Sequence, residues 1–344
     1  MGEGYKPPLI CIYGPTGSGK TDLAISISQQ LGAPIINADS MQIYEECNIL
    51  SAKPTLEEQS QAKFHLIDFV AINESFNSFR WRELALEIIS KSQTPLIICG
   101  GTIEYFQNLF WQKKSENFQK FHDIDSKEKA NKIYDELLEK YPEISEKIHR
   151  NDFLKIRKFL QSTEKLEKID NPVFFINLTI SPEILGSRIK HRAQKMLELG
   201  VLEEISTIKN KLDQLPKNEE KGGLLAAIGF NLDISDTDAF LEKLIGQTIL
   251  YAKKQQKNVR ILDGCLEKFD FDVTEINNND NRTKIALEKI QEFLKNPKFL
   301  SEKNEKVFKI LTCEKCGRQI DENSIQSHKK SKKCRNFGKA KKNL

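Results

Sequence analysis

The segment GPTGSGKT, residues 14–21, has the residue types and spacing of a loop that binds phosphate groups. It matches G-x-x-x-x-G-K-[ST] at every fixed position and lies between an apolar run, LICIY, and a stretch of helical periodicity. Glycines allow a tight turn whose backbone N–H groups point at phosphate oxygens, and the helix start adds its positive dipole end. The loop consists of Gly14, Pro15, Thr16, Gly17, Ser18, Gly19, Lys20 and Thr21. The pattern predicts phosphate or pyrophosphate binding, with Lys20 as a point charge and the Thr21 hydroxyl as a ligand for Mg²⁺.

A carboxylate follows the next apolar run, because PIINA, residues 34–38, is directly followed by Asp39. The carboxyl ends of parallel strands form the binding edge of an open sheet, so Asp39 is expected close to the phosphate loop. The run PLIIC ends instead in Gly100, Gly101 and Thr102, without the carboxylate with which a nucleotide hydrolase anchors Mg²⁺. Asp39 is therefore a candidate metal ligand or general base.

Short apolar strands alternate with helices and position these residues. Strands are predicted at residues 9–13, 34–38, 64–70, 95–101, 173–180 and 258–262, and helices at 20–31, 78–91, 181–200 and 280–296. Fully apolar strands separated by helices predict an α/β fold with a parallel sheet covered on both faces. The charge-rich stretch 111–170 is poor in strand formers, which predicts an inserted helical subdomain.

Composition indicates a folded, non-membrane protein. Of the 344 residues, 39% are hydrophobic and 30% charged, and no apolar run has the length of a membrane-spanning helix. The first strand begins so early that we expect no signal or transit peptide. Of the seven cysteines, Cys11, Cys47, Cys99 and Cys265 are scattered, and an odd count without a disulfide framework indicates reduced thiols. We therefore expect an intracellular monomer in the cytoplasm, with a nuclear or mitochondrial pool left open.

The C-terminal residues carry a concentrated positive charge. Residues 329–344 contain eight Lys or Arg and no acidic residue, whereas residues 1–328 contain 45 basic and 49 acidic residues. Such a run is either a solvated tail or a contact for a polyanion, since clustered Lys and Arg release counterions from a phosphate backbone.

The same region has the spacing of a small zinc finger, Cys313-x2-Cys316-x11-His328-x5-Cys334. Two thiolates from the first pair and an imidazole and a thiolate from the second would complete a tetrahedral, structural Zn²⁺ site. The alternative is a set of exposed thiols on a disordered tail.

Several segments together resemble the tRNA dimethylallyltransferase (tRNA isopentenyltransferase) family. They are GPTGSGKT, NADSMQIY (37–44), SAKP (51–54), FHLID (64–68), GGTIEYFQNL (100–109), HRNDFLKIR (149–157), RIKHRAQKMLELG (188–200) and YAKKQ (251–255). The resemblance implies that the phosphate loop holds the diphosphate of dimethylallyl diphosphate, and that the acceptor is N6 of the adenosine 3′ to the anticodon of tRNA. It also implies a P-loop NTPase-like core, and the C-terminal finger is similar to that of eukaryotic members.

The resemblance also implies roles for individual residues. Asp39 is expected to take the proton of the attacking amine, Thr102 to supply an active-site hydroxyl, and Arg188 and Arg192 to bind the diphosphate together with Lys20. Contacts to the tRNA anticodon stem-loop are expected from Asp39, Ser40, Met41, Gln42, Asn151, Asp152 and Arg157. Alternatively, Arg188 and Arg192 are two solvated residues on one face of a helix and bind no ligand.

Three positions depart from the family pattern. Ala226 stands where the family has Arg or Gln, Asn231 where a basic residue is usual, and Ile249 where Arg is expected. These departures leave the chemical centre intact and weaken the expected grip on tRNA.

The expected organisation is a core of residues 8–110 and 171–300, the insertion at 111–170, and a zinc finger with a basic tail at 308–344. Three alternatives remain open from sequence. One is prenylation of a free adenine nucleotide (AMP, ADP or ATP), which the basic finger disfavours. Another is a P-loop nucleotide kinase with an RNA-binding finger, which the missing carboxylate before Gly100 disfavours. The third is a non-catalytic RNA-binding protein, which the intact phosphate loop and Asp39 oppose.

Overall fold

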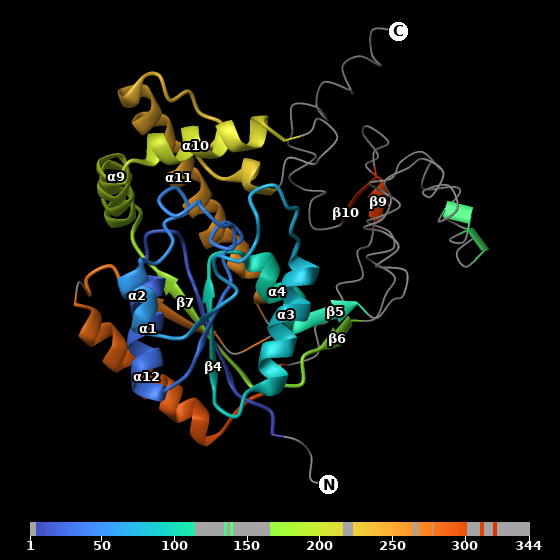
Figure 1. Cartoon of the computed structure of the whole chain (residues 1–344). Coiled ribbons are helices and arrows are strands. Elements are labelled where there is room, and N and C mark those ends of the chain that lie inside the picture. Colours follow the sequence, from blue (N-terminus) through green and yellow to red (C-terminus); the bar gives the residue numbers. More distant parts are fainter. Residues whose placement is uncertain are drawn as a thin grey trace, which may run out of the picture. The chain divides into compact units, whose positions relative to one another are not determined.

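Six strands pair in parallel in the computed structural model of the chain, in the order β3-β2-β4-β1-β7-β8 (Figure 1). They are β1 (Leu9–Tyr13), β2 (Ile35–Asn37), β3 (Phe64–His65), β4 (Leu96–Gly100), β7 (Val173–Thr179) and β8 (Lys268–Asp272). Strand β1 is buried along its whole length between β4 and β7, as expected for an apolar strand in a doubly covered sheet. Its last residue, Tyr13, pairs with Gly100, so the carboxyl ends of β1 and β4 lie at one edge.

The structure describes residues 5–113, 134–135, 138–139, 166–215, 223–263, 266, 268–276, 278–300, 310–312 and 319–321. The chain forms two compact units, one of Met1–Gln112 with Glu167–Glu302 and the other of Lys113–Leu166 with Lys303–Leu344. The sheet and the helices described below belong to the first unit. None of the described helices is long and apolar enough to span a membrane.

The helices begin and end at residues with the expected capping chemistry. They are α1 (Lys20–Leu31), α2 (Leu56–Ser60), α3 (Ser78–Lys91), α4 (Ile103–Phe110), α9 (Pro182–Glu198), α10 (Val201–Asp213), α11 (Thr237–Asn258) and α12 (Asn279–Lys295), with 3-10 helices η1 (Gly223–Ala226) and η2 (Val259–Leu262). The Ser181 hydroxyl accepts a hydrogen bond from the N–H of Ile184 and so caps α9. The left-handed Gly200 separates α9 from α10.

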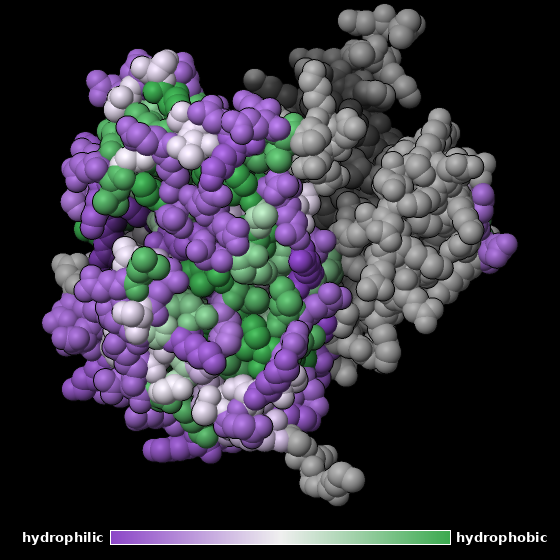
Figure 2. All heavy atoms as spheres, viewed as in Figure 1, coloured by the Kyte–Doolittle hydropathy of each residue, from purple (hydrophilic) through white to green (hydrophobic). Residues whose placement is uncertain are grey.

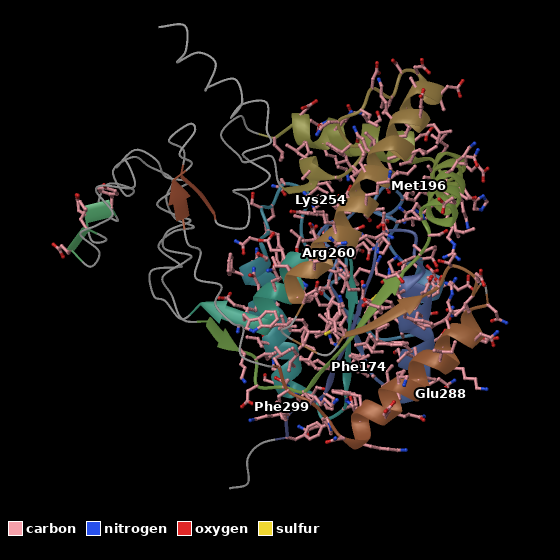
Figure 3. All side chains as sticks on the ribbon, turned by 180° about the vertical axis from the view of Figure 1, so that it is seen from behind. Phe174, Met196, Lys254, Arg260, Glu288 and Phe299 are labelled. Carbon is pink, nitrogen blue, oxygen red and sulfur yellow. The ribbon has the colours of Figure 1, made fainter. Side chains whose placement is uncertain are left out.

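Helices cover both faces of the sheet. On one face, α1 and α12 lie side by side (Figure 1), and Phe174 of β7 stacks on Phe293 of α12 with ring centroids 5.2 Å apart (Figure 3). We call the apolar cluster on this side the first core; it contains Ile10, Ile12, Leu23, Ile27, Ile97, Phe174, Ile176, Ala252 and Ile290 among others. On the other face, α3 and α4 supply Trp81 and Phe106, and the Trp81 indole donates to the carbonyl of Asn37 at 2.8 Å. In the space-filling view, hydrophilic side chains surround an apolar area near the middle of the face that is seen (Figure 2).

A second apolar cluster joins α9, α10 and α11 to the segment that follows β2. This second core contains Ile43, Tyr44, Cys47, Leu50, Met196, Val201, Ile205, Ile208, Leu212, Phe230, Phe240 and Leu244 among others. Met196 projects from α9, as Figure 3 shows from behind. The second core therefore packs the segment after Asp39 against α9, α10 and α11.

Most of the predicted elements are confirmed, one predicted strand is wrong, and another is shorter than predicted. Residues 258–262 form η2 rather than a strand, because Val259 and Leu262 are three residues apart and a 3-10 turn buries both on one side. The sixth strand is β8, further along. The predicted strand 64–70 stops after His65, because Leu66 and Asp68 have left-handed φ angles of 57° and 54°.

Shorter pairs of strands complete the description. Strands β5 (Trp111–Lys113) and β6 (Leu166–Lys168) pair with each other, and β9 (Ile310–Thr312) pairs antiparallel with β10 (Gln319–Asp321). Most of the predicted helical insertion lies outside the described residues.

Gly100 is the position where the sheet leaves no room for a side chain. A Cβ on Gly100 would lie 2.0 Å from the carbonyl oxygen of Ala38, which is backbone and cannot move aside. We expect Gly100→Ala to lower the free energy of unfolding by about 3 kcal/mol, the upper range for overpacking. Urea denaturation followed by circular dichroism measures the change.

Gly246→Ala is the matched control, because the same substitution in α11 meets nothing within 4 Å. It is expected to stabilise the protein by about 0.5–1 kcal/mol through helix propensity. Equal effects of the two substitutions would contradict the close approach at Gly100.

Candidate functional site

The phosphate loop joins β1 to α1 at the carboxyl edge of the sheet. Gly17 and Gly19 have φ angles of 85° and 86°, a left-handed conformation that side chains disfavour. The Lys20 ammonium donates to the carbonyl of Pro15 at 3.0 Å, so it folds back over the loop. The Ser18 hydroxyl is fully buried and has no hydrogen-bond partner among the described residues. The loop thus has the form of an anion receptor with polar groups still to be satisfied.

Cations from other elements surround the loop. The Arg192 guanidinium of α9 donates to the Thr16 hydroxyl at 2.8 Å, and burial lowers the pKa values of both Arg192 and Lys20. Arg188, one turn earlier, interacts electrostatically with Asp22 and Arg282 rather than with Thr16. The concentration of buried positive charge favours an anionic ligand of more than one charge.

Arg282 is a cation that sequence reasoning did not identify. Its guanidinium donates to the carbonyls of Ile276 and Val273, at 2.5 and 3.3 Å, and is only 5% exposed. A Cβ on Gly19 would lie 2.8 Å from Arg282 Nη1, so α12 closes the outer side of the loop. A lone Arg in an amphipathic helix gives no sequence signal for this position.

Gln255 of α11 ties the loop to the end of β4. Its Oε1 accepts from the N–H of Thr16 at 2.8 Å, while its Nε2 donates to the carbonyl of Gly101 at 2.9 Å. The Tyr13 hydroxyl donates to the Gln255 carbonyl at 2.8 Å. Gln255 is 3% exposed, and its buried hydrogen bonds link the ends of β1 and β4. We call this link the strut of the phosphate loop. The segment YAKKQ contains this residue, but its role is visible only in three dimensions.

The structure brings Asp39, Ser40 and Thr102 together at the same edge. The Ser40 N–H donates to the Thr102 hydroxyl at 3.0 Å, and Asp39 Oδ1 accepts from the N–H of Met41 at 3.0 Å. The Asp39 carboxylate raises the pKa values of Lys20 and Arg192, partly offsetting the effect of burial, so it lies within electrostatic range of both. No described residue donates a hydrogen bond to the second oxygen, Oδ2. A proton acceptor and an anion receptor therefore adjoin each other.

A buried lysine shapes the segment that follows Asp39. Lys53 Nζ donates to the Tyr44 carbonyl at 2.7 Å and to Asn48 Oδ1 at 2.8 Å, and forms an ion pair with Asp68. Gln42 Nε2 donates across the segment to the carbonyl of Ala52 at 3.0 Å. Left-handed φ angles occur here at the non-glycine residues Glu46, Ala52, Leu66 and Asp68. Such a strained backbone is held by its surroundings, which is common at ligand sites.

The loop alone offers too few oxygen ligands for Mg²⁺, so it fits the ion only when a bound anion supplies further oxygens. Thr21, in the first turn of α1, offers one hydroxyl, and no cluster of three or more His, Cys, Asp or Glu that could hold a metal occurs among the described residues. Mg²⁺ commonly takes one or two protein oxygens and completes its octahedron with phosphate oxygens and water.

Seven of the predicted site residues lie outside the described part of the chain. They are Asn151, Asp152 and Arg157 and the proposed zinc ligands Cys313, Cys316, His328 and Cys334. Two of the three departures from the family pattern have acquired structural contacts: Asn231 donates to the carbonyl of Leu225 at 2.8 Å, and Ile249 packs against the first core. Ala226 is exposed in η1.

Comparison with known proteins gives a consistent result. A protein-family model described as IPP transferase matches residues 42–261. The tRNA dimethylallyltransferase of Acetivibrio thermocellus is 32% identical over 294 residues, covering 78% of this chain and 94% of the relative. That of Thermosipho melanesiensis is 37% identical over 228 residues, covering 60% and 74%.

Solved structures share the fold. A eukaryotic dimethylallyltransferase acting on tRNA superposes with a TM-score of 0.69 at 22% identity, covering 98% of both chains. The full-length tRNA isopentenylpyrophosphate transferase from Bacillus halodurans gives a TM-score of 0.60 at 23% identity, covering 85% of this chain and 99% of that one.

The strut at Gln255 is open to a direct test. Gln255→Leu keeps the size of the side chain and removes both hydrogen bonds to the loop and to Gly101. We expect it to weaken the binding of inorganic pyrophosphate with Mg²⁺ about tenfold, the loss typical of one or two buried hydrogen bonds. Titration calorimetry measures the affinity.

Gln256→Leu is the control, because the neighbouring Gln256 donates to the carbonyl of Ile180 at 3.1 Å and has no hydrogen bond to the loop. Its pyrophosphate affinity is expected to stay within about twofold of wild type. The same loss in both variants would exclude a specific role for Gln255.

Proposed function

Because this chain belongs to the IPP transferase family, we propose that it transfers a dimethylallyl group from dimethylallyl diphosphate to tRNA. The acceptor atom is N6 of the adenosine that follows the anticodon on its 3′ side. The single observation that carries the proposal is the Asp39 carboxylate beside the cations of the phosphate loop, at a sheet edge where β4 ends in Gly100.

The phosphate loop binds the leaving group. Backbone amides of the loop, Lys20 and Arg192 stabilise the negative charge that develops as the C1–O bond of the donor breaks and pyrophosphate departs. Their burial makes these interactions stronger than they would be in water. The Thr21 hydroxyl would hold Mg²⁺ once the diphosphate is bound, and the ion would supply additional charge neutralisation.

Asp39 accepts the proton of the nucleophile. The exocyclic amine attacks C1, a new N6–C1 bond forms, and the amine proton passes to Asp39 Oδ2, while Oδ1 remains fixed by the Met41 N–H. The Thr102 hydroxyl accepts from the N–H of Ser40, the residue that follows Asp39, and helps orient the amine.

The acceptor base must leave its stack to reach this edge. Ser40, Met41 and Gln42 continue directly from Asp39 and supply polar and apolar groups for an extruded base. Asn151, Asp152 and Arg157 complete the RNA contacts. A nucleotide kinase is less well supported, because β4 ends without a carboxylate for its Mg²⁺.

A zinc finger follows the catalytic unit in this proposal. Strands β9 and β10 form an antiparallel pair, and the chain between them contains Cys313 and Cys316. Two ligands between paired strands, with His328 and Cys334 after them, suit a structural Zn²⁺. With its basic tail the finger adds affinity for the phosphate backbone of tRNA. We propose that the protein works as a monomer, because one chain supplies all the residues named here, and that it works in the cytoplasm.

The reaction is tested by incubating the protein with dimethylallyl diphosphate, Mg²⁺ and either unmodified tRNA or AMP. Mass analysis of the nucleosides is expected to reveal dimethylallyl-adenosine in the tRNA digest and no modified AMP. Modification of AMP alone would favour the free-nucleotide alternative, and no transfer to either acceptor would contradict the proposal.

Asp39→Asn removes the proton acceptor while preserving shape. We expect kcat on tRNA to fall about 10²- to 10⁴-fold, the contribution of a positioned general base, with pyrophosphate affinity unchanged. Lys20→Ala serves as the contrast and is expected to weaken pyrophosphate binding as well as turnover. Near wild-type turnover of Asp39→Asn would exclude this carboxylate as the base.

The finger is tested by deleting residues 303–344 and, separately, by Cys313→Ser. Both changes are expected to lower tRNA affinity and to flatten its dependence on salt, because fewer phosphate contacts release fewer counterions. Turnover at saturating tRNA should persist. Zinc content is measured alongside, since small zinc sites are generally unfolded without metal. Equal salt slopes for wild type and both variants would show that the tail is a solvated segment without contacts to the tRNA backbone.

A further inference from the structure

The Glu204 side chain, in the first turn of α10, holds three consecutive backbone amides. Its Oε2 accepts from the N–H groups of Asn48 and Ile49, both at 2.8 Å, and its Oε1 accepts from that of Leu50 at 2.9 Å. Consecutive amides that converge on one anion form the same kind of receptor as a phosphate loop. Here the anion is a side chain from a helix about 150 residues further along the chain.

These amides lead by a short path to the acceptor side of the site. Leu50 is followed by Ser51 and Ala52, whose carbonyls accept from Gln42 Nε2 at 3.4 and 3.0 Å. Glu204 therefore holds the amide groups of residues 48–50, and Gln42 holds the carbonyls of the two residues that follow. Gln42 Oε1 has no hydrogen bond within the described part of the chain, which leaves it able to accept one from a bound base.

Apolar packing alone cannot define this orientation. Cys47 and Leu50 lie in the second core with Ile205 and Ile208 of α10, which holds the segment against the helix. Hydrophobic contacts are non-directional, whereas three hydrogen bonds to one carboxylate fix how the turn is rotated. Lys53, which donates to Asn48 Oδ1, holds the same turn from its other side.

We propose that Glu204 is a positioning residue for the acceptor RNA. It orients the 48–52 turn so that Gln42 faces the extruded base, without itself touching either substrate. The inference rests on the proposed function, because it takes tRNA as the acceptor. It separates two tasks within one site: Glu204 sets acceptor binding, and the phosphate loop sets donor binding.

The test compares Glu204→Ala and Glu204→Gln with wild type in two binding measurements. Fluorescence anisotropy reports the affinity for a labelled anticodon stem-loop RNA, and calorimetry reports the affinity for pyrophosphate with Mg²⁺. We expect Glu204→Ala to weaken RNA binding about tenfold, as for the loss of hydrogen bonds to a charged group, and to leave pyrophosphate affinity within about twofold. Glu204→Gln retains an acceptor oxygen and is expected to lose about threefold in RNA affinity.

Chemical rescue separates positioning from general destabilisation. Acetate added to Glu204→Ala supplies a carboxylate to the vacated amides and is expected to restore RNA binding, relative to chloride at the same ionic strength. Glu203→Gln is the matched control, because Glu203 shares the first turn of α10 but is exposed. It changes the charge near the helix N-terminus equally and should bind RNA as wild type does.

Three results would overturn the proposal. They are unchanged RNA affinity in Glu204→Ala, a parallel loss of RNA and pyrophosphate affinity, or the same effect of acetate and chloride. Should Glu204→Ala fail to fold, the two affinities of Glu204→Gln decide in the same way. Failure of the proposed function has a different signature, because wild type itself would then fail to modify tRNA.

Discussion

Two backbones meet without a side chain between them where Gly100 approaches Ala38. The hydrogen bonds that follow depend on this approach: the Ala38 N–H donates to Cys99, the Thr102 N–H to Ala38, and the Ser40 N–H to Thr102. A side chain at residue 100 would separate the ends of β2 and β4 and move Asp39 away from the loop. The placement of Asp39 beside the phosphate loop thus depends on the missing side chain at Gly100 more than on any single attraction.

The burial of charged side chains in the site destabilises the folded protein. Lys20 and Arg192 are cations whose burial disfavours their charged forms, and Asp39 offsets only part of this. In the proposed function, a diphosphate ligand would supply the missing negative charge and so stabilise the folded state. The arrangement is suited to release as well as to binding, because the Lys20 ammonium has a resting partner in the Pro15 carbonyl.

Sequence predicted the parts of the fold that depend on local pattern. The phosphate loop, its strand and its helix follow from glycine spacing and apolar periodicity, and Asp39 from its place at a strand end. Gln255 and Glu204 did not stand out, because each acts on backbone groups far away in sequence. Arg282 did not stand out because its backbone partners are local and its approach to Gly19 exists only in the folded chain. The erroneous strand at 258–262 has a different cause. Val259, Arg260 and Ile261 alternate over too few residues to distinguish a strand from a helical turn, and the fold buries Val259 and Leu262 while Ile261 is exposed. Arg188 remains a prediction for the diphosphate, although its electrostatic partners are Asp22 and Arg282.

Helix α11 belongs to both cores, with Phe240 and Leu244 in the second and Ala252 in the first, and it then supplies Gln255 to the phosphate loop. The donor and acceptor halves of the site are therefore not separable modules. An engineer who replaced the acceptor-binding half with that of a relative would have to cut this helix or import it whole, together with the strut of the phosphate loop. Altered RNA specificity in such an enzyme is better sought by point substitutions on the 39–54 segment than by exchange of domains.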